Sequence, residues 1–318
     1  MALHVVTPVI ESRVLSHLAK KKVFLKLDNC QPSGSFKLRG VGLACQRAVE
    51  RGATHLIASS GGNAGLAVAC SAQKLGVPAT VFVPESTPAY MRARLEVEGV
   101  TVKVAGKVWL EAHEAATAFM ATKEAGTVAY IPPFDHPDIV DGNSSVIAEL
   151  KQQMPQPDLV VVAVGGGGYF SGICQGLETY GWSATKVLTM ETHGANKMQQ
   201  SVASNSRVTL SSINTLARSL GASAVSETAF AYAQKLGVHA SSVSDDDAVA
   251  ACLRFASDHK FLVEPACGAT LAPLYNGQLA TILGEDFDKI DSICLMICGG
   301  WMSDVPTSLH ASLAAMFK

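Results

Sequence analysis

The sequence predicts an α/β fold with mostly parallel, twisted sheets flanked by helices, and three features support this prediction. Short runs rich in valine, isoleucine and leucine alternate with longer segments of helical period, as in chains whose parallel strands are joined by crossover helices. Several of these runs are apolar throughout, as expected for strands that are buried on both faces. Many helical segments end at a glycine, a common residue at helix C-termini, as at Gly52, Gly76, Gly99 and Gly126.

The expected elements follow in order along the chain. Each expected strand is one of the apolar runs, at residues 23–26, 55–58, 80–83, 101–104, 128–131, 159–164, 187–190 and 293–297. Each expected helix is a segment of helical period, at residues 36–50, 63–75, 89–98, 110–123, 139–152, 170–180, 227–236, 248–259 and 269–283.

Two stretches are predicted to be domain boundaries. Residues 29–32 form a turn, and residues 132–137 contain three prolines that prevent regular structure. Because the segment between them holds its own strand–helix units, we expect a small domain, residues 30–133, inserted into a large domain made of residues 1–29 and 134–318. The cleft between the two domains is then the expected ligand site.

Composition excludes several classes of protein. Hydrophobic residues make up 48% of the 318-residue chain and charged residues only 16%, so the chain is not disordered. The 25 lysines and arginines nearly balance the 27 aspartates and glutamates, so no overall field attracts nucleic acid or an anionic membrane. We therefore expect neither nucleic acid nor a membrane as a partner.

Cysteine and histidine spacing, together with the N-terminal sequence, predicts a cytoplasmic protein with reduced thiols. None of the eight cysteines forms a C-x-x-C pair, and no two histidines have the spacing of zinc ligands. The chain begins without a basic stretch followed by an apolar run, and it has no apolar segment of roughly 18 residues. We expect the protein to be neither secreted nor membrane-spanning.

A run of four glycines follows the strand expected at 159–164 and precedes a helix. Glycines at this position let backbone N–H groups converge on an anion at the helix N-terminus, which favours phosphate binding at Gly165, Gly166, Gly167 and Gly168. A tight turn with no ligand is the structural alternative. The dinucleotide motif G-x-G-x-x-G is absent, but Glu191 lies where a ribose-binding acid is expected, so a nicotinamide enzyme stays open.

A second candidate is Lys37, in a small-residue loop that leads into a helix. Ser35 is expected to cap this helix, which would place Lys37 where the helix dipole disfavours a cation. Partial burial there lowers the pKa of a lysine and makes it suitable as a Schiff-base nucleophile. The alternative is a lysine that extends to solvent.

Two further loops carry candidate residues. The loop at residues 59–65 offers hydroxyls and open amides for a carboxylate, at Ser60, Gly61 and Asn63, although Asn63 could equally be a helix N-cap. Cys298 follows the last expected strand and precedes two glycines, and a thiol at such a position usually only fills the core.

Taken together and in this order, these motifs resemble the pyridoxal-phosphate enzymes of the tryptophan-synthase-β fold group, fold type II. Within that group the chain resembles the mammalian-type L-serine/L-threonine dehydratases. The resemblance extends over essentially the whole chain, from Thr7-Pro8 through Pro132-Pro133-Phe134-Asp135 to Val263-Glu264-Pro265. It implies two domains with the cofactor, pyridoxal 5'-phosphate, in the cleft between them.

The resemblance also implies roles for individual residues. The residue matching Lys37 binds the cofactor covalently and removes the substrate's α-proton, and the others that hold the cofactor are Phe36, Asn63, the four glycines and Cys298. Ser60, Gly61 and Asn63 hold the substrate carboxylate. A monovalent-cation site, with potassium as the candidate ion, falls on Glu191 and on the backbone carbonyls of Ala195, Leu220 and Ala222.

The activity implied is elimination of water and ammonia from a small amino acid by a homodimer. L-serine would give pyruvate, and L-threonine would give 2-oxobutanoate. By the resemblance, Cys298 approaches the cofactor's pyridine nitrogen. A neutral thiol there cannot hold a pyridinium by charge, and this favours elimination over transamination. The chain departs from the liver-type pattern at Gly61, where that pattern has alanine, and we expect the missing methyl to widen the pocket.

Three other interpretations remain open from the sequence. A racemase or a β-replacement enzyme of the same fold would show the same cofactor and carboxylate motifs. A nicotinamide oxidoreductase and a catalytically silent binding protein are the alternatives from other classes.

Overall fold

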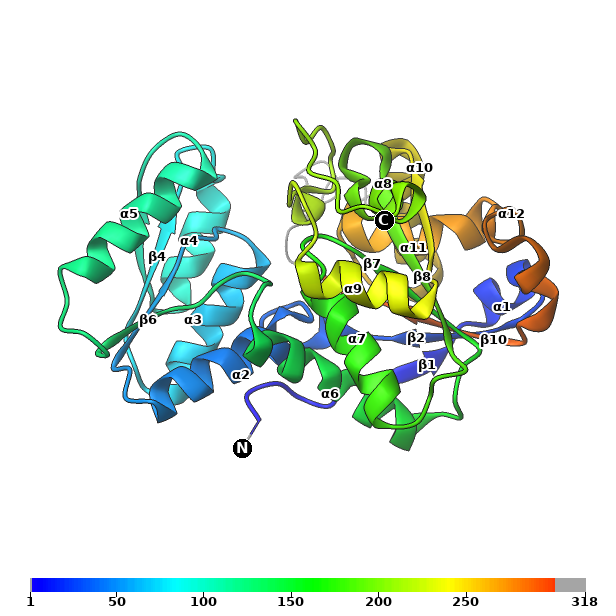
Figure 1. The fold of residues 1–318 in the computed structure, drawn as a ribbon, viewed down its shortest axis with the longest axis horizontal. Coiled ribbons are helices and arrows are strands. Elements are labelled where there is room, and N and C mark those ends of the chain that lie inside the picture. Colours follow the sequence, from blue (N-terminus) through cyan, green and yellow to red (C-terminus); the bar gives the residue numbers. More distant parts are fainter. Residues whose placement is uncertain (1, 301–318) are drawn as a thin grey trace, which may run out of the picture.

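The structure, a computed structural model, describes residues 2–300, so residue 1 and residues 301–318 of the predicted large domain lie outside the described residues. Figure 1 shows two lobes, each built around one sheet, and the α/β prediction is confirmed. The cyan lobe holds the small sheet, and the other lobe holds the large sheet.

The large sheet has six strands, and all neighbouring pairs are parallel except the first. Its order is β1 (Val9–Glu11), β2 (Lys22–Lys26), β10 (Ser292–Met296), β7 (Leu159–Ala163), β8 (Lys186–Thr192) and β9 (His239–Val243). Every residue of β7 is buried, as expected for a central strand whose two faces are covered. Helix α11 (Pro265–Tyr275) packs against β7, β8, β9 and β10.

The small sheet has four parallel strands, in the order β5 (Thr101–Val104), β4 (Ala79–Val83), β3 (His55–Ala58) and β6 (Val128–Tyr130). Side chains alternate between its faces, because successive residues of a strand point in opposite directions. Ile57 and Phe82 pack against α5 (Trp109–Ala121), whereas Leu56 and Val81 join the core that includes α3 (Asn63–Leu75).

The two lobes meet where α2 (Lys37–Glu50) packs against α6 (Pro137–Gln153), along the bottom of Figure 1. Glycines allow the close approach: a Cβ on Gly40 would lie 2.5 Å from the carbonyl oxygen of Ile139, and one on Gly142 would lie 2.4 Å from that of Arg39. The small sheet comes from residues between 55 and 130, inside the predicted insertion. The domain boundaries themselves stay a prediction.

A buried charge cluster lies beside this junction. The Arg39 guanidinium donates to both oxygens of Asp28, each at 2.7 Å, and also to Glu149 at 2.6 and 2.8 Å. Lys26 donates to Glu149 at 2.6 Å, and the Tyr169 hydroxyl donates to Asp28 at 2.6 Å. Burial alone would raise the pKa of Asp28, but Arg39 overrides it and holds that pKa below its ordinary value.

The remaining helices are α1 (Arg13–Ala19), α4 (Ala89–Val97), α7 (Gly168–Thr179), α8 (Lys197–Ser204), α9 (Glu227–Leu236), α10 (Asp245–His259) and α12 (Leu279–Leu283). Short 3-10 helices lie at Asp28–Cys30, His193–Ala195, Arg218–Leu220 and Gly284–Lys289. Across residues 2–300, no helix has both the length and the apolar character needed to cross a membrane.

The sequence prediction missed four elements and merged two others. Strands β1 and β9 and helices α1 and α8 were not expected. The single helix expected at 269–283 is wrong: α11 ends at Tyr275 and α12 starts at Leu279. Gly277, with a φ of +75°, lies between them and ends the helical path.

Candidate active site

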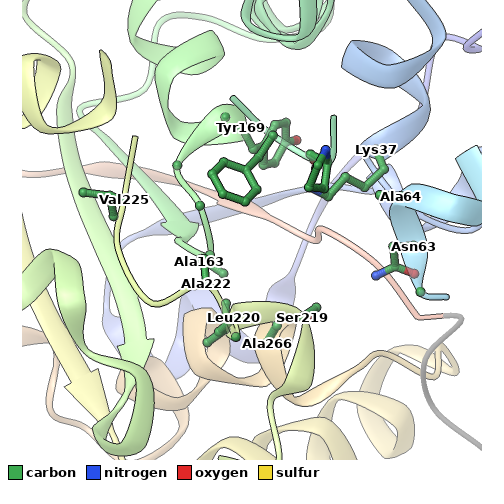
Figure 2. A pocket seen from close by; sticks show the side chains of 18 of the residues that line it. Lys37, Asn63, Ala64, Ala163, Tyr169, Ser219, Leu220, Ala222, Val225 and Ala266 are labelled. Atoms are coloured by element: carbon green, nitrogen blue, oxygen red, sulfur yellow. The ribbon is translucent and has the colours of Figure 1, made fainter. Parts of the chain in front are cut away.

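A cavity of about 630 Å³ lies between the two lobes, a size within the usual range for small-molecule sites. Residues from both lobes line it, among them Lys37, Asn63, Gly166, Tyr169, Ser219 and Glu264. Figure 2 shows Lys37 and Asn63 on one side of this pocket and Ser219 and Ala222 on another.

Lys37 is the first residue of α2, and its amine faces the cavity. Its Nζ donates to the carbonyl oxygen of Pro133 at 2.5 Å, so the side chain does not extend to bulk solvent. Burial lowers the pKa of Lys37 to about 8, against the opposing attraction of the Glu264 carboxylate. The expected low pKa is therefore present, and burial is its main cause.

The loop before Lys37 is fixed by backbone contacts to the end of β10. The Phe36 N–H donates to the Cys298 carbonyl at 2.9 Å, and Ser35 pairs with Gly299 in an isolated bridge. The Phe36 ring stacks on Tyr169 with centroids 4.1 Å apart. Ser35 does not cap α2 as expected, because Phe36 is the N-cap residue and no side chain caps that helix end.

Asn63 and Glu264 meet across the cavity. The Asn63 amide nitrogen donates to both Glu264 carboxylate oxygens, at 3.1 and 2.9 Å, and Ser219 Oγ donates to the same carboxylate at 2.6 Å. Gly62 is the N-cap of α3, so capping does not explain Asn63. The Asn63 Oδ1 is buried and has no hydrogen-bond partner among the described residues.

The loop at residues 59–62 reaches the cavity with Ser60 and Gly62, whereas Gly61 faces β4. A Cβ on Gly61 would lie 2.7 Å from Thr87 Cγ2 and 3.1 Å from Val83 Cγ1. The expectation that the missing methyl of Gly61 widens the pocket is therefore wrong, because that methyl would point into the small lobe.

The four glycines join β7 to α7 along one wall of the cavity. A Cβ on each would clash with the protein itself: with the Ser219 carbonyl for Gly165, the Phe134 ring for Gly166, Ala229 for Gly167 and the Phe134 carbonyl for Gly168. Close packing thus accounts for these glycines without a ligand. The loop nevertheless ends at the N-terminus of α7, where first-turn amides lack intrahelical partners and favour an anion.

Cys298 lines the cavity and is buried. Its hydrogen bond with the Cys267 thiol, together with burial, holds the pKa of Cys298 well above its ordinary value. The thiol is therefore neutral at physiological pH.

Comparison with known proteins accounts for this arrangement. The sequence pattern of the family described as "Pyridoxal-phosphate dependent enzyme" matches residues 2–299. This chain belongs to that family. The resemblance inferred from the motifs is confirmed.

Three relatives show how near the match is. The human protein named "Serine dehydratase-like" is 44% identical over 300 residues, which cover 93% of this chain and 90% of that protein. The human "L-serine dehydratase/L-threonine deaminase" is 43% identical, and the alignment covers 94% of this chain and 91% of that protein. The crystal structure of a fungal L-serine ammonia-lyase from Rhizomucor miehei aligns over the whole of both chains, with a TM-score of 0.87 and 32% identity.

The residues around the cavity fit the family's cofactor. Lys37 offers an amine of lowered pKa for covalent attachment, and the end of the glycine loop offers amides for a phosphate. The family resemblance implies that Asn63 would bond the cofactor's phenolic oxygen, and the amide nitrogen available for such a bond is the one that now donates to Glu264.

The residues expected to bind a monovalent cation surround a lysine side chain instead. Ala195 and Leu220 direct their carbonyls, and Glu191 its carboxylate, at the ammonium of Lys197. Ala222, the fourth expected ligand, lines the cavity (Figure 2). Burial lowers the pKa of Lys197 and raises that of Glu191, and the attraction between the two groups opposes both shifts.

Sequence reasoning missed Glu264, Ser219, Tyr169 and Lys197. Glu264 was noted only as part of a family motif, and Lys197 was not singled out. The one available signal for Lys197 is its position two residues after the expected carbonyl donor Ala195. Nothing in the local sequence indicates that such a lysine turns inward.

Proposed function

We propose that this protein eliminates water and ammonia from L-serine, to give pyruvate, and from L-threonine, to give 2-oxobutanoate. Family membership and the names of its relatives support a lyase that depends on pyridoxal phosphate. The single observation that carries the proposal is the amine of Lys37, which lies in the interlobe cavity with a pKa lowered to about 8.

The residues of the chain would divide the work as follows. When bound, pyridoxal phosphate supplies an electron sink that makes the α-proton of an amino acid acidic. Lys37 would take that proton, and its lowered pKa favours the neutral amine that can accept it. Ser60, Asn63 and the amides of the loop that contains Gly61 would hold the substrate carboxylate at the N-terminus of α3.

Roles for Phe36 and Cys298 are also part of the proposal. Phe36, stacked on Tyr169, would support the cofactor ring from the side of α2. The neutral Cys298 thiol would approach the pyridine nitrogen without a charge, which limits delocalisation into the ring and favours departure of the β-hydroxyl.

Two measurements test the function. A covalently attached cofactor absorbs near the edge of the visible range, and a nicotinamide site does not. Release of oxo acid and ammonia from serine and threonine, followed beside formation of D-serine, then separates a lyase from a racemase and from a silent binder. Absorbance without any oxo acid would overturn the proposed function while leaving the family assignment intact.

We also propose a homodimer in the cytoplasm, with residues 30–133 as its small domain. The family resemblance supports the dimer, and eight free cysteines support a reducing compartment. Light scattering of the purified protein measures the subunit number. Potassium is left out of this proposal because a lysine ammonium lies among its expected ligands.

A further inference from the structure

The ammonium of Lys197 lies at the centre of a cage of oxygen atoms. It donates to the carbonyl oxygens of Val164 at 3.0 Å, Ala195 at 3.0 Å and Leu220 at 2.9 Å. The Glu191 carboxylate lies 3.1 Å from the same nitrogen, and both side chains are fully buried. Three carbonyl oxygens and one carboxylate are also suitable ligands for a monovalent metal ion.

The geometry favours the charged form of Lys197. Four oxygen atoms surround its nitrogen, the three carbonyl oxygens and one Glu191 carboxylate oxygen, and an ammonium has three N–H donors to share among them. A neutral amine has only two, so its lone pair would face an oxygen. Glu191 balances the positive charge, and it also accepts the backbone N–H groups of Met198 at 3.1 Å and Gln199 at 2.9 Å.

We propose that Lys197 is a built-in monovalent cation, and that this enzyme therefore needs no potassium or sodium ion at this position. An ammonium and a potassium ion are of nearly equal size and charge. A metal ion could bind here only by displacing a buried ammonium from all of its partners or by lying next to it, and like charges at such a distance repel strongly in a buried site.

Lys197 is a positioning residue because it acts on the cavity through the backbone. Val164 immediately precedes the glycine loop, and Leu220 follows Ser219, whose hydroxyl holds Glu264. The carbonyl of Ser219 also lies against Gly165. One ammonium therefore ties the end of β7, the turn after β8 and the loop at residues 218–220 into one wall of the pocket.

The first test uses the wild-type holoenzyme after dialysis into tetramethylammonium chloride. Elimination rates are compared in potassium, sodium, ammonium and tetramethylammonium chlorides at one ionic strength, and we expect no change. Binding of thallous ion, followed by thallium NMR, is measured on the same protein, and we expect none at this site. Stimulation by potassium, or site-specific thallous binding, would overturn the proposal.

The second test compares two variants that both remove the charge. Lys197→Ala opens space for an ion, whereas Lys197→Met fills most of that space with an apolar chain. Because either change leaves Glu191 buried without its cation, we expect each variant to lose at least about tenfold in kcat. Potassium and ammonium should restore Lys197→Ala towards the wild-type rate, tetramethylammonium should not, and Lys197→Met should respond to none of them.

Thermal unfolding and thallous binding give readouts that do not depend on catalysis. Potassium should raise the unfolding midpoint of Lys197→Ala but not that of Lys197→Met, since only a bound ion stabilises the folded state. A folded Lys197→Ala protein that ignores every cation would overturn the proposal. If that variant does not fold, the ion dependence and thallous binding of the wild-type enzyme still test the proposal. These binding data do not depend on the proposed substrates, so failure here is distinguishable from failure of the proposed function.

Discussion

The amide nitrogen of Asn63 donates to both carboxylate oxygens of Glu264, at 3.1 and 2.9 Å, and this contact joins the N-terminus of α3 to the loop before α11. Because Ser219 donates to the same carboxylate at 2.6 Å, Glu264 connects the two walls of the cavity. The carboxylate is also the group that most opposes the lowering of the Lys37 pKa. Glu264 thus affects both the shape and the charge of the site.

The first prediction concerns the charge of Glu264. In Glu264→Gln the pKa of Lys37 should fall below the wild-type value of about 8, because the attraction that favours the ammonium is lost while burial remains. The pKa can be measured on the cofactor-free protein from the pH dependence of Lys37 acetylation, followed by peptide mass spectrometry. Glu178→Gln, at the far end of α7, is the matched control and should leave that pKa unchanged. An unchanged or raised pKa in Glu264→Gln would contradict the electrostatic role.

The second prediction is that Lys37→Ala abolishes covalent attachment of the cofactor and lowers elimination by at least about 10³-fold, the scale of a lost acid–base group. Borohydride reduction of the wild-type holoenzyme followed by peptide mapping should place the label on Lys37. Lys235→Ala, a largely exposed lysine on α9, is the control and should keep full activity. A label on any other lysine would refute the assignment.

The third prediction tests Cys298 as a neutral partner of the cofactor's pyridine nitrogen. Cys298→Ser keeps a small uncharged group and should retain substantial elimination. Cys298→Asp introduces a carboxylate that can hold a protonated ring nitrogen, so exchange of the α-proton with solvent and racemisation should rise relative to elimination. Proton NMR in heavy water measures α-proton exchange and elimination, and chiral chromatography of the recovered amino acid measures racemisation. Loss of all activity in Cys298→Ser with the cofactor still bound would require a more direct role for the thiol.

The sequence was sufficient for the elements whose signal is local. β7 and β3 are short apolar runs, and α3 begins and ends at the predicted residues because Gly62 and Gly76 delimit it. β9 was missed because its five residues, His239–Val243, include two serines and only one fully buried side chain, so its edge position leaves little hydrophobic signal. The break between α11 and α12 was missed because both segments are apolar enough to continue one helix.

For the candidate site, the sequence identified residues in loops but not their long-range partners. Lys37 was predictable from the small residues before it and from its place at the start of a helix. The carboxylate that most opposes its pKa shift, Glu264, is 227 positions further along the chain, and only the folded structure brings them together. Lys197 was missed for the same reason, since its carbonyl partners belong to three separate segments.

The fourth prediction concerns the buried pair of Asp28 and Arg39. Asp28→Asn removes one carboxylate from a fully buried guanidinium and should lower the free energy of unfolding by about 3–5 kcal/mol. Because the folded-state pKa of Asp28 is lowered, its contribution is complete above its unfolded pKa of about 3.9 and is lost as the pH falls through the folded value. The stability difference between wild type and variant should therefore persist at neutral pH and shrink only in strong acid.

Urea unfolding at several pH values measures this difference. Asp286→Asn, which removes a carboxylate from a partly exposed ion cluster, is the control and should change stability less. An Asp28→Asn protein as stable as the wild type at pH 7 would show that Glu149 alone balances Arg39.

The fifth prediction concerns Gly61, whose Cβ position lies against β4 and the following turn. In Gly61→Ala the new methyl would lie 2.7 Å from Thr87 Cγ2, 3.0 Å from Thr87 Oγ1 and 3.1 Å from Val83 Cγ1. The Thr87 side chain can turn away, but Val83 belongs to the fully buried strand β4, so we expect the loop at residues 59–62 to shift. Since small displacements beside reacting atoms can cost about 100-fold, we expect kcat/KM for serine to fall by about tenfold or more. Thr87→Ala should change little by itself, and it should recover part of the loss in the double variant because it removes the two nearest clashing atoms while Val83 stays in place.

The ratio of serine to threonine activity distinguishes a displaced carboxylate-binding loop from a narrowed substrate pocket. A methyl that points into the small lobe displaces the carboxylate-binding loop for both substrates alike, so the ratio should stay at its wild-type value while both rates fall. A methyl that faced the substrate would instead penalise threonine more than serine, by up to about 1–3 kcal/mol. Steady-state kinetics of the four proteins of the Gly61 and Thr87 cycle on both substrates decide between the two. A selective loss of threonine activity, with no recovery on Thr87→Ala, would mean that residue 61 faces the substrate after all.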